Sequence, residues 1–262
     1  MAEWLAVVIL GIVEGITEFL PISSTGHLLL AEQWLRIRES DTFLVVIQCG
    51  AVAAVLLIFQ ERVRQLLSAW RDPLARDYLL KLSVAFAVTA AGGLVLQKLG
   101  FELPETAAPV AIALVVGGVL FIAVERWLKD RLTTTTISWQ TAALVGVAQL
   151  AAAVFPGTSR SGATILVAMA LGVSRDLAIE FSFLLGVPTL LAAGAVKLLS
   201  ALRHPGREVL HPDMLVLGTV ISAITAFLAI RWMLRYLRSH TFESFGWYRI
   251  ALGAVVLLAA LL

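Results

Sequence analysis

The chain has 262 residues, of which 60% are hydrophobic and only 15% are charged, and its formal net charge at pH 7 is +2. Soluble domains are typically about half apolar and about a quarter charged, so this composition excludes an ordinary soluble domain. The chain has no basic patch with interleaved aromatic residues, which gives nucleic-acid binding no support. Because about 20 apolar residues cross about 30 Å of hydrocarbon, the long apolar runs predict an all-α polytopic membrane protein.

Apolar runs and helix breakers divide a single integral membrane domain, residues 1–262, into ten predicted helical segments. In chain order they lie near 3–20, 25–35, 41–60, 75–98, 107–128, 138–155, 162–172, 176–200, 212–237 and 245–262. Segments 25–35 and 162–172 are only about 16 Å long at 1.5 Å per residue, too short to cross a membrane. Each follows a longer helix that ends in a Pro/Gly/Ser cluster. We therefore predict two re-entrant helical hairpins, whose broken backbone must be surrounded by protein or by a water-filled cavity.

The two halves of the sequence resemble each other at a constant offset. The matched patterns are Gly11-x-x-Glu14-(x)6-Pro21-x-Ser23-Ser24 and Gly146-x-x-Gln149-(x)6-Pro156-x-Thr158-Ser159. We predict two five-segment repeats, approximately 1–130 and 136–262, each with one re-entrant hairpin and three crossings. Six crossings result, and the odd number in each repeat inverts the second copy relative to the first.

The distribution of Lys and Arg predicts the orientation, because cytoplasmic loops are enriched in these residues. The enriched connections are 61–76, 126–137 and 231–243, which we place in the cytoplasm. The connection 99–106 contains Glu102 and Glu105 without Lys or Arg and should face outward. Two arginines in the 201–211 loop oppose this assignment, but the number of crossings places that loop outside. The first hairpin then opens to the outside and the second to the cytoplasm.

Glu14 and Glu18 are four residues apart, so both project from one face of a predicted helix. An ionisable residue at the centre of a membrane costs about 2.5–3.5 kcal/mol on insertion scales. A metal ion, an arginine or protonation of one carboxyl must compensate. The other interpretation is an interfacial helix whose acids face water. Since Glu18 lies three residues before a helix-breaking proline, we favour a functional acid pair.

The residues after that proline are polar and small. They are Ser23, Ser24, Thr25, Gly26 and His27. Such a loop at the start of a helix offers backbone N–H groups and a positive dipole end to an anion, so Ser23, Thr25 and Gly26 are predicted to bind substrate. Ser24 or Ser23 could act as a nucleophile and His27 as a general base or acid. The alternative is an ordinary serine cap followed by an unrelated histidine.

Arg160 occupies the matching break of the second half, between Ser159 and Ser161. Its guanidinium could bind phosphate oxygens in a bidentate manner and neutralise the acid pair, and the two serines are predicted to bind substrate beside it. A snorkelling arginine at the membrane interface is the alternative. Arg160 instead lies between two apolar segments at a predicted mid-membrane tip, which favours function.

Several further polar residues are weaker candidates. Gln48 and Gln149 could be hydrogen-bonding supports of the site or helix–helix contacts. Glu180 and Glu125 are expected to be structural, and Cys49 is expected to behave as a small core residue. Small residues such as Gly117 and Gly118 would permit close helix contacts and a homodimer.

Two motifs together resemble those of the undecaprenyl-diphosphate phosphatase family, also called the bacitracin-resistance family. They are Glu14-x-x-x-Glu18-Phe-Leu-Pro21-Ile-Ser23-Ser24-Thr25-Gly26-His27 and Pro156-Gly-Thr-Ser159-Arg160-Ser161-Gly162-Ala-Thr164. The motifs occur in the family's order and at a family-like separation, and the resemblance covers essentially the whole chain. The family's fold, with inverted repeats, two re-entrant hairpins and six crossings, agrees with the segments predicted above.

The resemblance implies an enzyme that removes the terminal phosphate of undecaprenyl diphosphate, so that cell-wall synthesis can reuse the lipid carrier. It implies a catalytic set and a divalent cation, Mg2+ or Ca2+, on the two acids. The catalytic residues would be Glu18, Ser24, His27 and Arg160, and the metal ligands Glu14 and Glu18. The expected location is the bacterial inner membrane, with the site opening to the periplasmic face. A lipid-carrier flippase is the alternative function, since broken helices and inverted repeats are transporter features.

Overall fold

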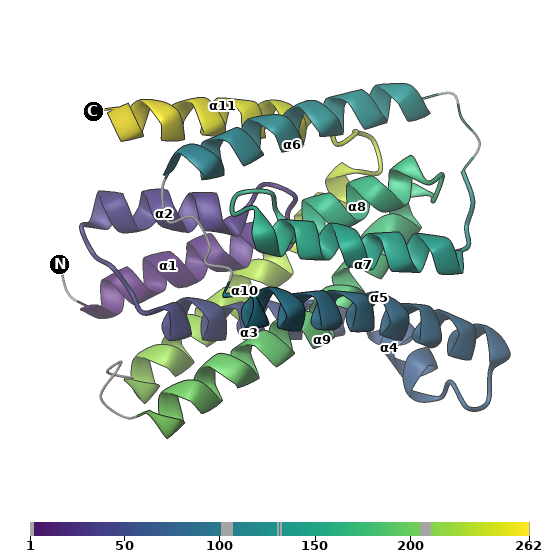
Figure 1. Cartoon of the computed structure of the whole chain (residues 1–262), viewed down its shortest axis with the longest axis horizontal. Helices are drawn as coiled ribbons and strands as arrows, with labels where there is room; N and C mark the ends of the chain where they lie inside the picture. The colour runs from purple at the N-terminus through teal and green to yellow at the C-terminus, as the bar shows by residue number, and fades with distance from the viewer. Residues whose placement is uncertain (1–2, 101–106, 130, 132, 205–210, 262) are drawn as a thin grey trace.

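The computed structural model describes residues 3–100, 107–129, 131, 133–204 and 211–261. This part of the chain forms eleven helices and no strand, which confirms the predicted all-α fold (Figure 1). The helices are α1 (Glu3–Thr17), α2 (Ser24–Leu35), α3 (Asp41–Ile58), α4 (Gln60–Leu67), α5 (Pro73–Lys98), α6 (Ala107–Leu128), α7 (Trp139–Val154), α8 (Arg160–Ala170), α9 (Arg175–Arg203), α10 (Pro212–Tyr236) and α11 (Glu243–Leu261). Every predicted segment corresponds to one of them.

Helix α4 was not predicted. It lies in the Arg-containing connection between α3 and α5, and none of its eight residues is buried. No apolar run marks this segment in the sequence, because α4 is an amphipathic surface helix rather than an apolar one.

Within the described residues, five helices are long and apolar enough to cross a membrane, namely α3, α5, α6, α9 and α10. The chain is therefore a multi-pass membrane protein. Helices α2 and α8 have 12 and 11 residues, too few to cross, in agreement with their predicted re-entrant role. The sixth predicted crossing corresponds to α11, and the total of six stays a prediction. The connection carrying Glu102 and Glu105 lies outside the described residues, so the orientation stays a prediction as well.

The two short hairpins, α1–α2 and α7–α8, occupy the centre of the molecule. Figure 1 shows them between the α6–α11 pair and a layer that contains α3, α5, α9 and α10. In this view the first hairpin enters from the left and the second from the right, and their tips meet near the middle. This opposed arrangement agrees with the predicted inversion and brings both polar breaks to one place.

Helix α1 packs against α10 as α7 packs against α5. One hydrogen bond recurs at the two contacts: the Thr225 hydroxyl donates to the Gly11 carbonyl at 3.4 Å, and the Thr89 hydroxyl donates to the Gly146 carbonyl at 2.9 Å. Matched contacts of this kind are expected of two halves built on one plan. The exact bounds of the repeats stay a prediction.

The two hairpin tips have the same type of helix N-cap, each formed by a serine. Ser23 and Ser159 have positive φ angles of 75° and 69°, and each side chain accepts the N–H of a glycine three residues later. These glycines are Gly26 and Gly162, with N···O distances of 3.4 and 3.2 Å. The serine hydroxyl thus satisfies one of the free N–H groups that begin each short helix.

The caps correct the alignment of the two halves. The constant offset paired Ser24 with Ser159, but the caps make Ser23 the counterpart of Ser159 and therefore Ser24 the counterpart of Arg160. The second half has one more residue between its proline and its capping serine. A constant offset could not reveal this insertion because serines and threonines surround both positions.

Helices α6 and α11 approach each other closely at paired glycines. A Cβ atom on Gly118 would lie 2.5 Å from the Gly246 carbonyl oxygen, and one on Gly246 would lie 2.7 Å from the Gly118 oxygen. The close helix contact expected at Gly118 therefore forms within the chain. The homodimer stays a prediction.

We predict that Gly118→Ala lowers the thermal midpoint of the detergent-solubilised protein, because the added methyl group meets backbone that cannot yield easily. Overpacking of this kind typically costs about 1–3 kcal/mol. Gly93→Ala in α5 is the matched control, since a Cβ there meets no atom within 4 Å. Equal midpoints for the two variants would contradict the close α6–α11 packing.

Candidate active site

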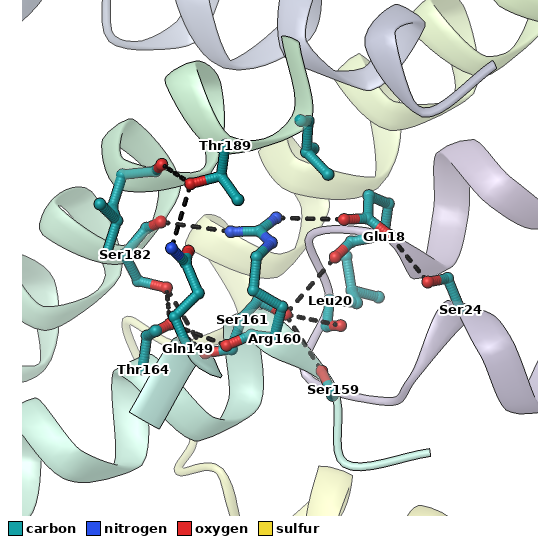
Figure 2. Close-up of polar contacts among 12 residues, drawn as sticks. Glu18, Leu20, Ser24, Gln149, Ser159, Arg160, Ser161, Thr164, Ser182 and Thr189 are labelled. Carbon is teal, nitrogen blue, oxygen red and sulfur yellow. Dashed lines mark hydrogen bonds and ion pairs between the residues drawn. The ribbon is translucent and has the colours of Figure 1, made fainter. Parts of the chain in front are cut away.

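The two breaks place an acid against an arginine in the interior of the protein. Glu18 follows the end of α1, and Arg160 is the first residue of α8. The Arg160 Nη2 and Glu18 Oε1 atoms are 3.2 Å apart, and the two side chains are only 12% and 6% exposed (Figure 2). The sequence required a group that compensates the buried acids, and at Glu18 the structure shows an arginine in this role.

Arg160 is held from the side opposite Glu18 by helix α9. Its Nη1 donates to the Ser182 carbonyl at 3.4 Å, and its guanidinium carbon lies 4.9 Å from the centre of the Phe19 ring. Gly186 leaves room for it, because a Cβ there would lie 2.4 Å from Nη1. The buried Nε has no hydrogen-bond partner among the described residues. Since a guanidinium carries five N–H donors, Arg160 retains donors for an anionic ligand.

Ser24 is bonded to the same carboxylate as Arg160. Its hydroxyl donates to Glu18 Oε2 at 2.7 Å, while Glu18 Oε1 faces the guanidinium (Figure 2). Ser24 is half-buried and is the first residue of α2. A hydroxyl within hydrogen-bond distance of a carboxylate is the arrangement of a nucleophile and its base.

Glu14 is fully buried, and neither of its carboxylate oxygens has a hydrogen-bond partner among the described residues. The charged groups that act on it are Glu18 and, with opposite sign, Arg160. A buried carboxylate without donors is unfavourable, and a hard cation with oxygen ligands would relieve it. The described residues contain no group of three or more potential metal-ligating side chains. Mg2+ is commonly held by one or two carboxylates together with substrate phosphates, so these two acids fit such an ion.

His27 does not bond Ser24 in this structure. Its Nδ1 lies 2.7 Å from the Ser23 carbonyl oxygen, and its Nε2 lies 2.7 Å from the Tyr248 hydroxyl of α11. Because a carbonyl oxygen only accepts, Nδ1 is the protonated nitrogen. In this structure the Ser24 hydroxyl donates to Glu18 rather than to His27, and a role of His27 as general base or acid stays a prediction.

The residues predicted to bind substrate mostly build the tips. Besides the two capping serines, the Ser161 hydroxyl donates to the Leu20 carbonyl at 3.2 Å and so joins the second tip to the first. Gly26 is buried within its cap, whereas Thr25 is exposed. Contact between these residues and a substrate stays a prediction.

Gln149, the counterpart of Glu14, supports the helices around the second tip. Its Nε2 donates to the hydroxyls of Thr89 on α5 and Thr189 on α9, both at 3.0 Å. Thr189 lies two turns beyond Ser182 on α9. This helix therefore contacts Gln149 through the Thr189 hydroxyl and Arg160 through the Ser182 carbonyl (Figure 2).

The two acids expected to be structural are bonded outside the site. Glu180 pairs with Arg62 at 2.8 Å. Glu125 pairs with Arg175 at 2.7 Å rather than with its sequence neighbour Arg126. The Glu125–Arg175 pair lines a cavity of about 670 Å³ that shares no lining residue with the acid–arginine centre.

Arg249 was missed in the sequence. It is fully buried in α11 and, among the residues that the structure describes, donates only to backbone carbonyls: those of Pro21, Ala113, Gly157 and Thr158, at 2.9 to 3.2 Å. An arginine within the apolar segment 245–262 is the same signal that drew attention to Glu14. Its partners are backbone carbonyls, which no residue type marks. The sequence could therefore indicate that Arg249 is unusual but could not predict its partners.

We predict that Arg160→Met lowers the thermal midpoint more than the double substitution Arg160→Met/Glu18→Gln. Removing one member of a buried ion pair typically costs about 3–5 kcal/mol because the other charge is left uncompensated, whereas replacing both avoids that cost. Thermal unfolding in detergent measures the difference. A double variant that is less stable than Arg160→Met would contradict the buried pair.

Comparison with known proteins identifies the family. The family model described as "Bacitracin resistance protein BacA" matches residues 7–255. A Rhizobium johnstonii protein named undecaprenyl-diphosphatase is 52% identical over 256 residues, covering 97% of this chain and 96% of that protein. A protein of the same name from Xanthomonas oryzae pv. oryzae is 46% identical over 259 residues, covering 98% and 97%. A match along nearly the whole length, through both breaks, shows that the chain belongs to the bacitracin-resistance BacA family.

Proposed function

We propose that this protein hydrolyses undecaprenyl diphosphate to undecaprenyl phosphate and inorganic phosphate. The relatives' name supports this reaction. The observation that carries the proposal is the Glu18 carboxylate, which accepts the Ser24 hydroxyl at 2.7 Å and pairs with Arg160 at 3.2 Å. A nucleophile, its base and a group for binding anions thus meet at one buried acid.

Arg160 and the starts of α2 and α8 would bind the diphosphate. Helix N-termini favour anions through their free N–H groups and positive dipole ends, and Ser24 and Arg160 are the first residues of these two helices. Phosphoryl transfer depends mainly on positioning and on neutralising the transferred group. The arginine would exchange part of its contact with Glu18 for phosphate oxygens.

In the proposed chemical step, the Ser24 oxygen attacks the terminal phosphorus and its proton passes to Glu18. The bond from that phosphorus to the bridging oxygen breaks, and the electron pair stays on the bridging oxygen, which leaves as undecaprenyl phosphate. Water then attacks the phosphoserine, and the Ser24 oxygen regains a proton as inorganic phosphate leaves. The alternative is direct attack by water activated by Glu18 or His27.

Glu14 and Glu18 would hold a divalent cation, Mg2+ or Ca2+. The unpartnered oxygens of Glu14 support this assignment. The ion would supply positive charge to a substrate that carries several negative charges.

His27 would act at the rim of the site. Its Nδ1 bond to the Ser23 carbonyl fixes the residue before the nucleophile, and its Nε2 lies 2.7 Å from the hydroxyl of Tyr248, a residue that is partly exposed. We place the site on the periplasmic side of the bacterial inner membrane. The Lys and Arg of the 61–76, 126–137 and 231–243 connections support this orientation.

Purified wild-type protein is expected to release phosphate from a polyprenyl diphosphate in detergent with Mg2+, and to lose this activity with a chelator. Glu18→Gln and Arg160→Met should each lower kcat/KM by at least about 100-fold, as expected for the loss of a group that stabilises the transferring charge. Glu61→Gln on the exposed helix α4 is the control and should keep full activity. Absence of phosphate release by the wild type would refute the proposal, and headgroup transfer across liposomes without release would favour the flippase.

The covalent route predicts a phosphoenzyme on Ser24. With substrate labelled at the terminal phosphate, rapid acid quenching should trap the label on Ser24, and Ser24→Ala should abolish both label and turnover. Ser222→Ala is the matched control, because this serine is buried in α10 without a hydrogen-bond partner among the described residues. Turnover by Ser24→Ala close to the wild-type rate would select direct attack by water.

A further inference from the structure

We propose that Arg249 is a positioning residue that fixes the spacing of the two membrane breaks and thereby aligns Glu18, Ser24 and Arg160. The inference rests on the proposed function for its kinetic test. Arg249 reaches both breaks from α11: its Nη1 donates to the Pro21 carbonyl of the first at 3.1 Å. Its Nη2 donates to the Gly157 and Thr158 carbonyls of the second at 3.2 and 2.9 Å.

Three of the four carbonyls that accept from Arg249, those of Pro21, Gly157 and Thr158, lie just beyond the carboxyl ends of the broken helices. Helix α1 ends at Thr17 and α7 at Val154, and the bonded carbonyls follow within four residues of each end. Hydrocarbon cannot solvate such carbonyls, and the C-terminal end of a helix attracts a cation. Arg249 has no carboxylate partner among the described residues, so these carbonyls are what hold its charge in the interior.

Helix α6 leaves room for the Arg249 guanidinium and also bonds it. A Cβ on Gly117 would lie 2.2 Å from Nη2 of Arg249, and the Ala113 carbonyl one turn earlier accepts from the same nitrogen at 3.1 Å. The planar guanidinium keeps its donors at a fixed separation, which a lysine ammonium does not. The two tips are therefore held by the rigid Arg249 guanidinium, whose own position is set by Gly117 and the Ala113 carbonyl.

The bonded carbonyls are close in sequence to the reacting groups. Pro21 lies midway between Glu18 and Ser24, and Thr158 is two residues before Arg160. A shift of either tip therefore displaces one side of the acid–arginine pair relative to the other. Tyr248, the residue before Arg249, bonds His27. A single turn of α11 therefore contacts the first tip at two points.

Substitution of Arg249 should change turnover more than substrate binding. We expect Arg249→Met to lower kcat by about 100-fold with KM changed less than about threefold, because a displacement of about 1 Å can cost that much in rate. Arg249→Lys should recover part of kcat. Arg175→Met is the matched control: Arg175 also anchors α11, through Glu125, whose carboxylate accepts the Phe242 N–H at 2.8 Å. It should lower the thermal midpoint while kcat per folded protein stays at the wild-type value.

Gly117→Ala tests the same idea without removing a charge. Its methyl group would displace the guanidinium from its seat, so kcat should fall as in Arg249→Met, whereas Gly93→Ala should leave kcat unchanged. Hydrogen exchange provides a readout that needs no substrate. Peptides covering 18–27 and 155–162 should both exchange faster in Arg249→Met and in Gly117→Ala.

Two results would overturn the positioning role. One is wild-type kcat in folded Gly117→Ala and Arg249→Met, and the other is faster exchange at only one of the two breaks. Failure of the wild type to release phosphate would instead refute the proposed function. The exchange measurement would still decide whether Arg249 ties the breaks together.

Discussion

A helix that breaks inside a membrane leaves backbone groups that lipid cannot satisfy, and this constraint shapes the centre of the protein. Ser23 and Ser159 cap the amide ends of the two short helices, and the buried Arg249 binds carbonyls next to the carboxyl ends of the two helices before them. Each break is thus neutralised on one side by a cation and remains attractive to an anion on the other. The proposed anion-binding centre would be a consequence of how the backbone groups at the breaks are satisfied.

The two breaks have the same backbone structure but carry different side chains. The residue after the capping serine is Ser24 in the first half and Arg160 in the second, and the acid Glu14 is matched by the amide Gln149. Equivalent backbone positions that face each other therefore present a hydroxyl and an acid on one side and a cation on the other. The proposed phosphoryl transfer from a diphosphate would use both kinds of group at once, which two identical tips could not provide.

Residue types and spacing were sufficient to predict most of this arrangement. Apolar lengths located the helices, and charges within apolar segments selected Glu14, Glu18 and Arg160. The bond between His27 and Tyr248 could not be predicted, because α11 is more than 200 residues away and nothing in its sequence marks the contact. The insertion before Ser159 was hidden by neighbouring hydroxyl residues. Arg249 binds carbonyls, which every residue has, so its partners leave no pattern to recognise.

The sharing of Glu18 between Ser24 and Arg160 has a consequence for the proposed reaction. While Glu18 is charged, it holds the guanidinium and competes with the substrate for it. As the Ser24 proton passes to Glu18, that carboxylate becomes neutral and its attraction for Arg160 falls. The arginine is then free to follow the negative charge onto the transferring phosphoryl group. Arg160 would bind the transition state more strongly than the ground state, and only such a difference accelerates the chemical step.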